Sequence, residues 1–247
     1  MTLPFFKSSL HWHPEDRQGR LRRVLDRAHV HYSSKSPETA LNSLPVVDPP
    51  AHLPHLRSQK FRFPLAMPAR VAMFESGFSA DGALRRFAAR DTVELKEYVP
   101  EALVMPLHLA LTLADQKLRN LLELPTLTRA VVVLTSPEKP IDDHHRTLIW
   151  HAFRVPVFEQ FCLWDGMVVA RECEVHDGLH IDPAAVIFQK EGEDLIATQL
   201  TALESLILRV RTGLTATIVT EHCECGAETP RLRNLASLNV KARLAVA

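Results

Sequence analysis

The sequence predicts an α/β protein in which a layer of parallel strands and helices is followed by a small antiparallel β-rich module. Residues 130–136 (AVVVLTS) form an uninterrupted β-branched run, which is typical of a strand buried on both faces of a parallel sheet. A helix over 140–153, capped by Asp142 or Asp143, and an apolar strand over 155–161 come next. This order predicts a βαβ unit with parallel strands and a right-handed crossover.

The region after Gly166 predicts the antiparallel module. Five short apolar runs, separated by polar turns, are MVVAREC, AAVIFQK, EDLIATQL, LILRVRT and TATIVTE. Strands this short and this closely spaced favour a meander or a small barrel. We therefore place a boundary near 183–186. The chain then divides into an N-terminal helix with a proline-rich wrapping segment (1–70), an α/β subdomain (71–183) and a β-rich module with a C-terminal tail (184–247).

Residues 14–30 predict an amphipathic helix. Its apolar face consists of Leu21, Val24, Leu25 and Ala28. The arginines around this face indicate either a solvated surface or an anion or partner site, and we prefer the solvated surface. Prolines recur every few residues over 33–68, so this stretch predicts a loop-rich segment.

Four further elements are predicted before residue 130. Residues 71–76 read as a buried strand, and residues 80–90 as a helix. The alternating pattern of 92–99 predicts a strand. The stretch 100–124 is expected to be helical, with Pro106 as a kink or a boundary.

Charge and composition argue against several functional classes. The 247 residues contain 29 Lys and Arg and 29 Asp and Glu, and this balance disfavours a general nucleic-acid or acidic-membrane surface. No apolar run approaches the roughly 20 residues of a membrane span, and the N-terminus shows no secretory signal, so we expect a cytoplasmic protein. Glycine is scarce, with 8 residues, which weakens any nucleotide-binding interpretation because few positions let backbone wrap a phosphate.

Three of the four cysteines lie near histidines and predict a metal site. Cys173 precedes His180 in RECEVHDGLH. Cys223 and Cys225 stand one residue apart, and a glycine follows them in a pattern that resembles a zinc knuckle. Thiolate and imidazole groups suit a tetrahedral Zn²⁺, and four such ligands make a closed, structural site.

The spacing alone leaves alternatives open. His176 and His222 compete for the fourth position, and ordinary reduced cysteines fit the same spacing because C-x-C is less diagnostic than C-x-x-C. An unrelated zinc hydrolase is a further interpretation, since a carboxylate near the ligands can activate water. The carboxylates in question are Glu172, Glu174 and Glu224. Two or more thiolates, however, make a poor hydrolytic site.

From about Val131 to Leu232 the order of motifs resembles the phenylacetate–CoA ligase (CapK-like) branch of the adenylate-forming enzymes. The segment before the helix over 140–153 stands at the place of that family's Gly-Gly-Glu turn. Four further family motifs are Tyr-Gly-x-Thr-Glu, Glu-Cys…Asp-Gly-x-His, Arg-Tyr-Arg-Thr-Gly-Asp and Cys-Pro-Cys-Gly with a later Pro-Arg. They are matched here by 161–165, 172–180, 209–214 and 223–231. The resemblance implies a shortened, truncated adenylate-forming core.

The same resemblance implies site residues. Some family members hold zinc with the residues that match Cys173, His180, Cys223 and Cys225. This match selects His180 as the fourth ligand. Phe161 stands where the family has an adenine-stacking aromatic. The vestigial candidates for a catalytic role are Asp165, Arg211 and Thr212.

Several family features are missing. Trp164 replaces a small hydroxyl residue, and Leu214 replaces the Asp that accepts the ribose hydroxyls, although leucine accepts no hydrogen bond. The segment 76–82 lacks the pattern of a phosphate-binding loop and reads as a turn. We also expect no lid domain after the C-x-C motif, and Lys241 is no convincing substitute for its lysine. We therefore expect neither ATP nor CoA to be a cofactor.

Two hypotheses of function follow. The first is a catalytically inactive relative, a pseudoenzyme with a structural zinc, that acts by contact with another protein chain or a second copy of itself, or by binding an acyl or aromatic ligand. The second is an enzyme that activates a carboxylic acid with ATP, as an acyl-CoA ligase or adenylyltransferase, and is completed by a partner chain. The broken nucleotide motifs favour the first hypothesis.

Overall fold

The computed structural model describes residues 14–31, 36–49, 59–75, 77–79, 82–89, 91–201 and 206–238. These residues form two sheets. The strands of the larger sheet are β1 (Val71–Met73), β2 (Leu84–Arg86), β3 (Ala102–Pro106), β4 (Ala130–Thr135), β5 (Val157–Cys162), β6 (Val168–Glu172), β7 (Leu179–Ile181), β11 (Leu214–Val219) and β12 (Arg231–Ser237). The strands of the smaller sheet are β8 (Val186–Glu191), β9 (Asp194–Gln199) and β10 (Val210–Arg211).

The larger sheet changes from parallel to antiparallel along its width. Its order is β11-β12-β7-β6-β5-β4-β3-β1-β2. All pairs from β2 to β5 are parallel, and all pairs from β5 to β11 are antiparallel. The smaller sheet is antiparallel, in the order β10-β9-β8. The predicted fold class is therefore confirmed, whereas the division of the chain at 70 and 183 stays a prediction.

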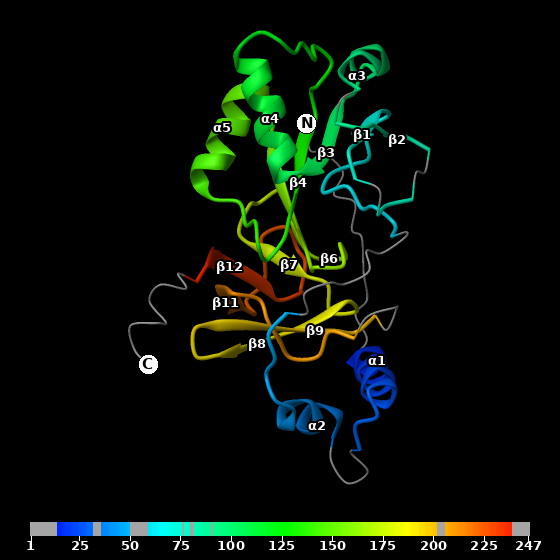
Figure 1. Ribbon diagram of the computed structural model, residues 1–247, viewed down its shortest axis with the longest axis vertical. Helices are drawn as coiled ribbons and strands as arrows, with labels where there is room; N and C mark the ends of the chain where they lie inside the picture. Colours follow the sequence, from blue (N-terminus) through cyan, green and yellow to red (C-terminus); the bar gives the residue numbers. More distant parts are fainter. Residues whose placement is uncertain are drawn as a thin grey trace.

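Two helices, α4 (Leu107–Leu118) and α5 (Asp143–Phe153), lie side by side against the parallel strands (Figure 1). The β-branched run of β4 explains this arrangement, because its side chains alternate between two cores. Val131 and Val133 join the core that contains residues of α4 and α5, and Val132 joins the core on the opposite face. The β4-α5-β5 unit predicted from the sequence is present.

The N-terminal helices pack against the smaller sheet. The predicted amphipathic helix forms α1 (Pro14–Arg27), and α2 (Pro37–Ser43) follows it, with the Ser36 side chain accepting a bond from the Thr39 N–H at 3.2 Å. Leu21 and Leu25 are fully buried in a cluster that includes Ile187 of β8. The apolar face of α1 thus has a partner, as its periodicity requires.

Two elements predicted before residue 107 are wrong in type, and the start of a third is wrong. The predicted helix over 80–90 contains the strand β2, because pairing with β1 overrides the helix propensity of its residues. Residues 92–99 instead contain the helix α3 (Thr92–Tyr98), which is too short to reveal a 3.6-residue period. The predicted helix over 100–124 begins only at Leu107, because the preceding apolar residues form β3, buried on both faces. Of the two interpretations of Pro106, the boundary is confirmed, because Pro106 is the N-cap of α4.

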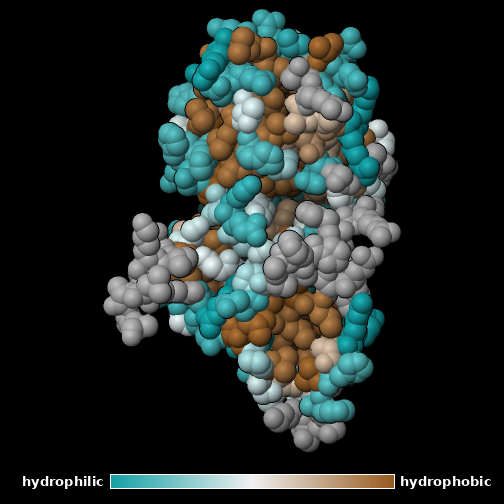
Figure 2. All heavy atoms as spheres, viewed as in Figure 1, coloured by the Kyte–Doolittle hydropathy of each residue, from teal (hydrophilic) through white to brown (hydrophobic). Residues whose placement is uncertain are grey.

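The surface shows two further features. None of the described helices is long and apolar enough to span a membrane. On the face drawn in Figure 2, apolar residues gather over the region of the smaller sheet, between hydrophilic neighbours. Val47, which bridges to Val210 of β10, is 44% exposed, and Leu206, in the segment between β9 and β10, is 39% exposed.

The N-cap of α5 gives a test of this fold. Asp142 accepts a hydrogen bond from the His145 N–H at 2.7 Å, so Asp142→Ala should lower the free energy of unfolding by about 1 kcal/mol. Asp115→Ala is a matched control, because Asp115 is exposed within α4 and pairs only with Arg119, and its effect should stay within about 0.5 kcal/mol. Urea denaturation of both variants measures the difference, and equal losses would contradict the capping role.

Candidate metal centre

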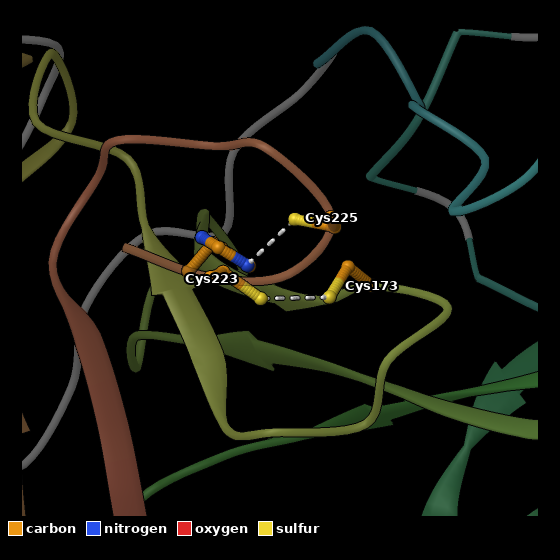
Figure 3. Close-up of side chains that lie close together, drawn as sticks. Cys173, Cys223 and Cys225 are labelled. Carbon is orange, nitrogen blue, oxygen red and sulfur yellow. Dashed lines mark hydrogen bonds between the residues drawn. The ribbon is translucent and has the colours of Figure 1, made fainter. Parts of the chain in front are cut away.

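Four side chains from distant parts of the chain meet at one point: Cys173, His180, Cys223 and Cys225. One potential ligand atom from each lies within 4.8 Å of the other three. The Sγ atoms of Cys173 and Cys223 are 3.8 Å apart, and the Sγ atom of Cys225 is 3.4 Å from Nε2 of His180 (Figure 3). The four residues are those that the sequence singles out, and the described residues contain no other such group.

Local turns bring these ligands together. Cys173 directly follows β6 and His180 lies on β7, and the antiparallel pair places them at the two ends of one turn. Gly178 in that turn has a φ of +87°, and a Cβ there would meet the Leu232 carbonyl oxygen at 2.6 Å, so the turn requires glycine. The two remaining cysteines lie in the loop between β11 and β12, where the Gly226 N–H donates to the Cys223 carbonyl at 2.9 Å.

The geometry fits a tetrahedral zinc ion. With Zn–S bonds of about 2.3 Å, a tetrahedron requires sulfur atoms about 3.8 Å apart, and with a Zn–N bond of about 2.0 Å it requires sulfur and nitrogen about 3.5 Å apart. The observed separations of 3.8 Å and 3.4 Å are close to both values. Four protein ligands leave no position for a reactive water, so this donor set suits a structural ion.

The protonation states also suit a metal. Burial raises the pKa of the Cys173 thiol to about 12 and also raises the pKa of Cys225, so without an ion these thiols keep their protons. A bound cation would displace these protons. Burial, together with the positive charge of Arg231, lowers the pKa of His180, so its imidazole is neutral. The Nδ1 atom of His180 contacts Thr229 Oγ1 at 3.0 Å, which leaves Nε2 facing the thiols.

The two alternative histidines make other contacts. His176 Nδ1 lies 3.1 Å from Glu172 Oε1, and the His176 ring stacks on Phe158 with centroids 4.7 Å apart. His222 is exposed, although Cys223 follows it directly. Neither belongs to the group of four potential ligands.

The residues matched to a nucleotide site are used within the protein. The Phe161 ring is fully buried, and its centroid is 6.3 Å from that of Phe188. Leu214 is fully buried in the same apolar core. Asp165 is also buried, and its two carboxylate oxygens accept bonds from the Met167 N–H at 3.0 Å and from Gln199 Nε2 at 2.8 Å. These groups present no free face to a ligand.

Arg211 and Thr212 hold the β9–β10 region together. Arg211 donates to the buried carboxylate of Asp194 at 2.6 Å. The Thr212 hydroxyl donates to the Leu195 carbonyl at 2.8 Å and accepts from the Leu214 N–H at 3.1 Å. Of the other sequence-based candidates, Lys241 and three residues of the 76–82 turn lie outside the described part of the chain.

A buried pair of carboxylates was missed by the sequence analysis. Glu159 and Glu172 lie on the neighbouring strands β5 and β6 and line a cavity of about 900 Å³. Arg146 Nη1 donates to Glu172 at 3.0 Å, and its Nη2 lies 3.6 Å from Glu159. The sequence signals were the acidic residue inside the apolar run VPVFEQF and Glu172, which was considered only as a carboxylate near the metal ligands. Neither signal indicates that the two carboxylates are neighbours.

The environments of these two carboxylates push their pKa values apart. Burial raises the pKa of Glu159 to about 7, although the Thr135 hydroxyl and Arg146 oppose this effect. Burial alone would raise the pKa of Glu172, but hydrogen bonds from His176 and from the Glu159 N–H, with the charge of Arg146, bring it below its ordinary value. The Glu159 carboxyl therefore gains and loses its proton near neutral pH, whereas the Glu172 carboxylate stays ionised.

The fold is similar to that of an adenylate-forming CoA ligase. A structure of 2-hydroxyisobutyryl-CoA ligase in complex with 2-HIB-AMP and CoA in the thioesterification state matches with a TM-score of 0.65 and 13% identity. The match covers 92% of this chain and 68% of that chain. An open conformation of the same ligase matches with a TM-score of 0.57 and 14% identity over 69% of this chain, which spans about half (48%) of that ligase. No protein-family model and no curated protein matches the sequence.

The raised pKa of Glu159 predicts a pH-dependent stability. In the folded protein this carboxyl keeps its proton up to about pH 7, but in the unfolded chain it loses the proton near its ordinary pKa of 4.5. Folding is therefore increasingly opposed as the pH rises from 4.5 to 7. Glu159→Gln should gain about 2 kcal/mol relative to the wild type between pH 5 and pH 8.

Denaturant titrations at pH 5 and pH 8 measure this difference, and subtraction of the wild-type values removes the contributions of the other groups. Glu138→Gln is the matched control, because Glu138 is exposed. The difference in stability between this variant and the wild type should be the same at both pH values. A constant difference between Glu159→Gln and the wild type at the two pH values would contradict the raised pKa.

Proposed function

We propose that the protein is a catalytically inactive relative of the adenylate-forming acyl-CoA ligases, of the phenylacetate–CoA ligase type, with a structural zinc site. It acts through contact with another protein chain, or by binding an acyl or aromatic ligand. The observation that carries this proposal is the internal use of the residues at the nucleotide-binding positions. Phe161 and Leu214 are core residues, and both oxygens of Asp165 accept hydrogen bonds from the protein.

These contacts support the proposed loss of a nucleotide site. An adenine needs an exposed aromatic face, and the ribose hydroxyls need an acceptor that has no other partner. A magnesium ion needs a carboxylate oxygen that is open to it. Recruiting Asp165 would break its bond to Gln199, and exposing Phe161 would open the apolar core that contains Leu214. Both of these changes cost free energy and therefore oppose the binding of a nucleotide.

The zinc in this proposal stabilises the fold and performs no chemistry. Cys173, His180, Cys223 and Cys225 would hold it, and the ion would supply a cross-link between the two loops that carry them. The exposed apolar side chains Val47 and Leu206 support contact with a partner, because exposed apolar surface is typical of interaction sites.

One observation favours a second candidate function, in which a partner chain completes an ATP-dependent activation of a carboxylic acid. The cavity of about 900 Å³ is lined by Ile141 and Asp142, which directly follow the segment at the place of the family's Gly-Gly-Glu turn. This cavity offers room for a ligand beside that segment.

Calorimetric titration with Mg·ATP, combined with metal analysis of the same sample, separates the two candidates. The inactive relative should contain one zinc per chain and give no binding heat with ATP. Clear ATP binding followed by acid-dependent release of pyrophosphate would contradict inactivity and support the second candidate.

A cysteine substitution tests the structural role of the metal. Cys225→Ser should lose the bound zinc and lower the free energy of unfolding by about 2 kcal/mol or more, because metal binding is coupled to folding. Cys162→Ala is the control, since Cys162 is buried outside the ligand group and its loss should leave one zinc per chain. Unchanged zinc content and melting temperature in Cys225→Ser would refute the metal site.

A further inference from the structure

Arg231 is a buried cation beside the metal centre that neither the ligand set nor the nucleotide motifs explain. Its side chain is 1% exposed and is among the largest fully buried side chains of the described residues. On the backbone, Arg231 of β12 pairs directly with His180 of β7. A buried guanidinium is costly in free energy unless its donors and its charge have partners.

The guanidinium of Arg231 bonds both loops that carry the cysteines. Its Nη1 donates to the Asp177 carbonyl at 3.0 Å and to the Asp177 carboxylate. Its Nη2 donates to the Glu221 carbonyl at 3.1 Å and contacts the His222 carbonyl at 3.5 Å. Asp177 lies in the turn between Cys173 and His180, and the other two carbonyls directly precede Cys223. One side chain therefore spans the two halves of the ligand set.

The charge of Arg231 also complements that of the site. A divalent ion held by three thiolates and a neutral imidazole leaves one net negative charge. The guanidinium carries the opposite charge, and its bonds to the Asp177 carbonyl and to the Glu221 carbonyl hold that charge beside both ligand loops. The Asp177 carboxylate accepts hydrogen bonds from both Arg231 and Arg233. Its single negative charge therefore balances only one of these two positive charges.

We propose that Arg231 is a positioning residue of the metal centre, which fixes the spacing of the two ligand loops and offsets the excess negative charge of a three-thiolate site. This inference rests on the proposed zinc site. Hydrogen bonds around metal ligands orient those ligands, and loss of such a partner typically costs about 10–100-fold in metal affinity. Arg231 would act on both loops at once, through Asp177 on one side and through the 221–222 backbone on the other.

Three variants separate charge from geometry. Arg231→Met removes the charge and all donors, whereas Arg231→Lys keeps the charge but cannot span both loops with a rigid fork of donors. Arg233→Met is the matched control, because Arg233 also bonds the Asp177 carboxylate, but its side chain is 39% exposed and, within the described residues, it forms no hydrogen bond to the 221–222 backbone.

Cobalt(II) titration of the full chain is the test, because tetrahedral thiolate coordination gives a characteristic absorption spectrum. Zinc affinity is measured in parallel by competition with a chelator. Arg231→Met should bind zinc about 10–100-fold more weakly and show a weakened or shifted cobalt spectrum at saturation, with Arg231→Lys intermediate. Arg233→Met should keep the wild-type spectrum and an affinity within a few-fold of the wild type.

The outcomes distinguish the two proposals. If wild-type protein shows no tetrahedral cobalt spectrum, the metal site fails and the role of Arg231 fails with it. If the wild type shows the spectrum and both Arg231 variants reproduce its shape and affinity, only the positioning role is overturned, even where the variants unfold more easily. If Arg231→Met does not fold, Arg231→Lys gives the test alone. A wild-type spectrum and affinity in Arg231→Lys then overturn the positioning role.

Discussion

The pairing of β12 with β7 is the interaction on which the rest of the structure depends. It joins the last described strand to the middle of the chain and makes β11 and β12 part of the large sheet. The same pairing places Arg231 opposite His180, so the loop before β12 meets the turn between β6 and β7. Sheet geometry thus brings the four potential metal ligands together. The side chain of Arg231 forms hydrogen bonds with both of the loops that carry the cysteines.

The β-rich part of the molecule uses its polar groups for internal contacts. The side chains of Asp165, Arg211 and Thr212 each form hydrogen bonds with groups of neighbouring strands or turns. Leu214 packs in the apolar core of the same region. These internal bonds stabilise the fold, because a buried acceptor that has a partner costs less free energy than one without. The similarity to a CoA ligase concerns the architecture.

Much of this arrangement was predictable, because strong local patterns produce it. The β-branched run of β4 and the capping aspartate predict the β4-α5-β5 unit, and the cysteine motifs predict the four residues that the structure brings together. The elements β2 and α3 were mistaken for each other's type, since each is too short for its period to be read and tertiary pairing decides its conformation.

Long-range partners were the other source of error. Glu159 looks like an isolated acid within an apolar strand, and its partners Arg146 and Glu172 become neighbours only when the sheet forms. Arg231 stands in a motif that the sequence analysis matched, but nothing in its local sequence indicates that its guanidinium is buried. Burial of a charged group depends on which segments cover it, and this information is not local.

The order of strands has a consequence for the synthesis of this chain. When a ribosome has released β7, the strand that pairs with its outer edge still lies about fifty residues ahead, at Arg231. Until then β7 exposes unpaired backbone groups, which are prone to wrong pairing with other nascent chains. The cysteines at 223 and 225 emerge just before β12, so the ligand set assembles at the same late moment as the edge is covered. Vectorial folding therefore ends, for the described strands, with the assembly of the four potential ligands and the completion of the sheet as one event.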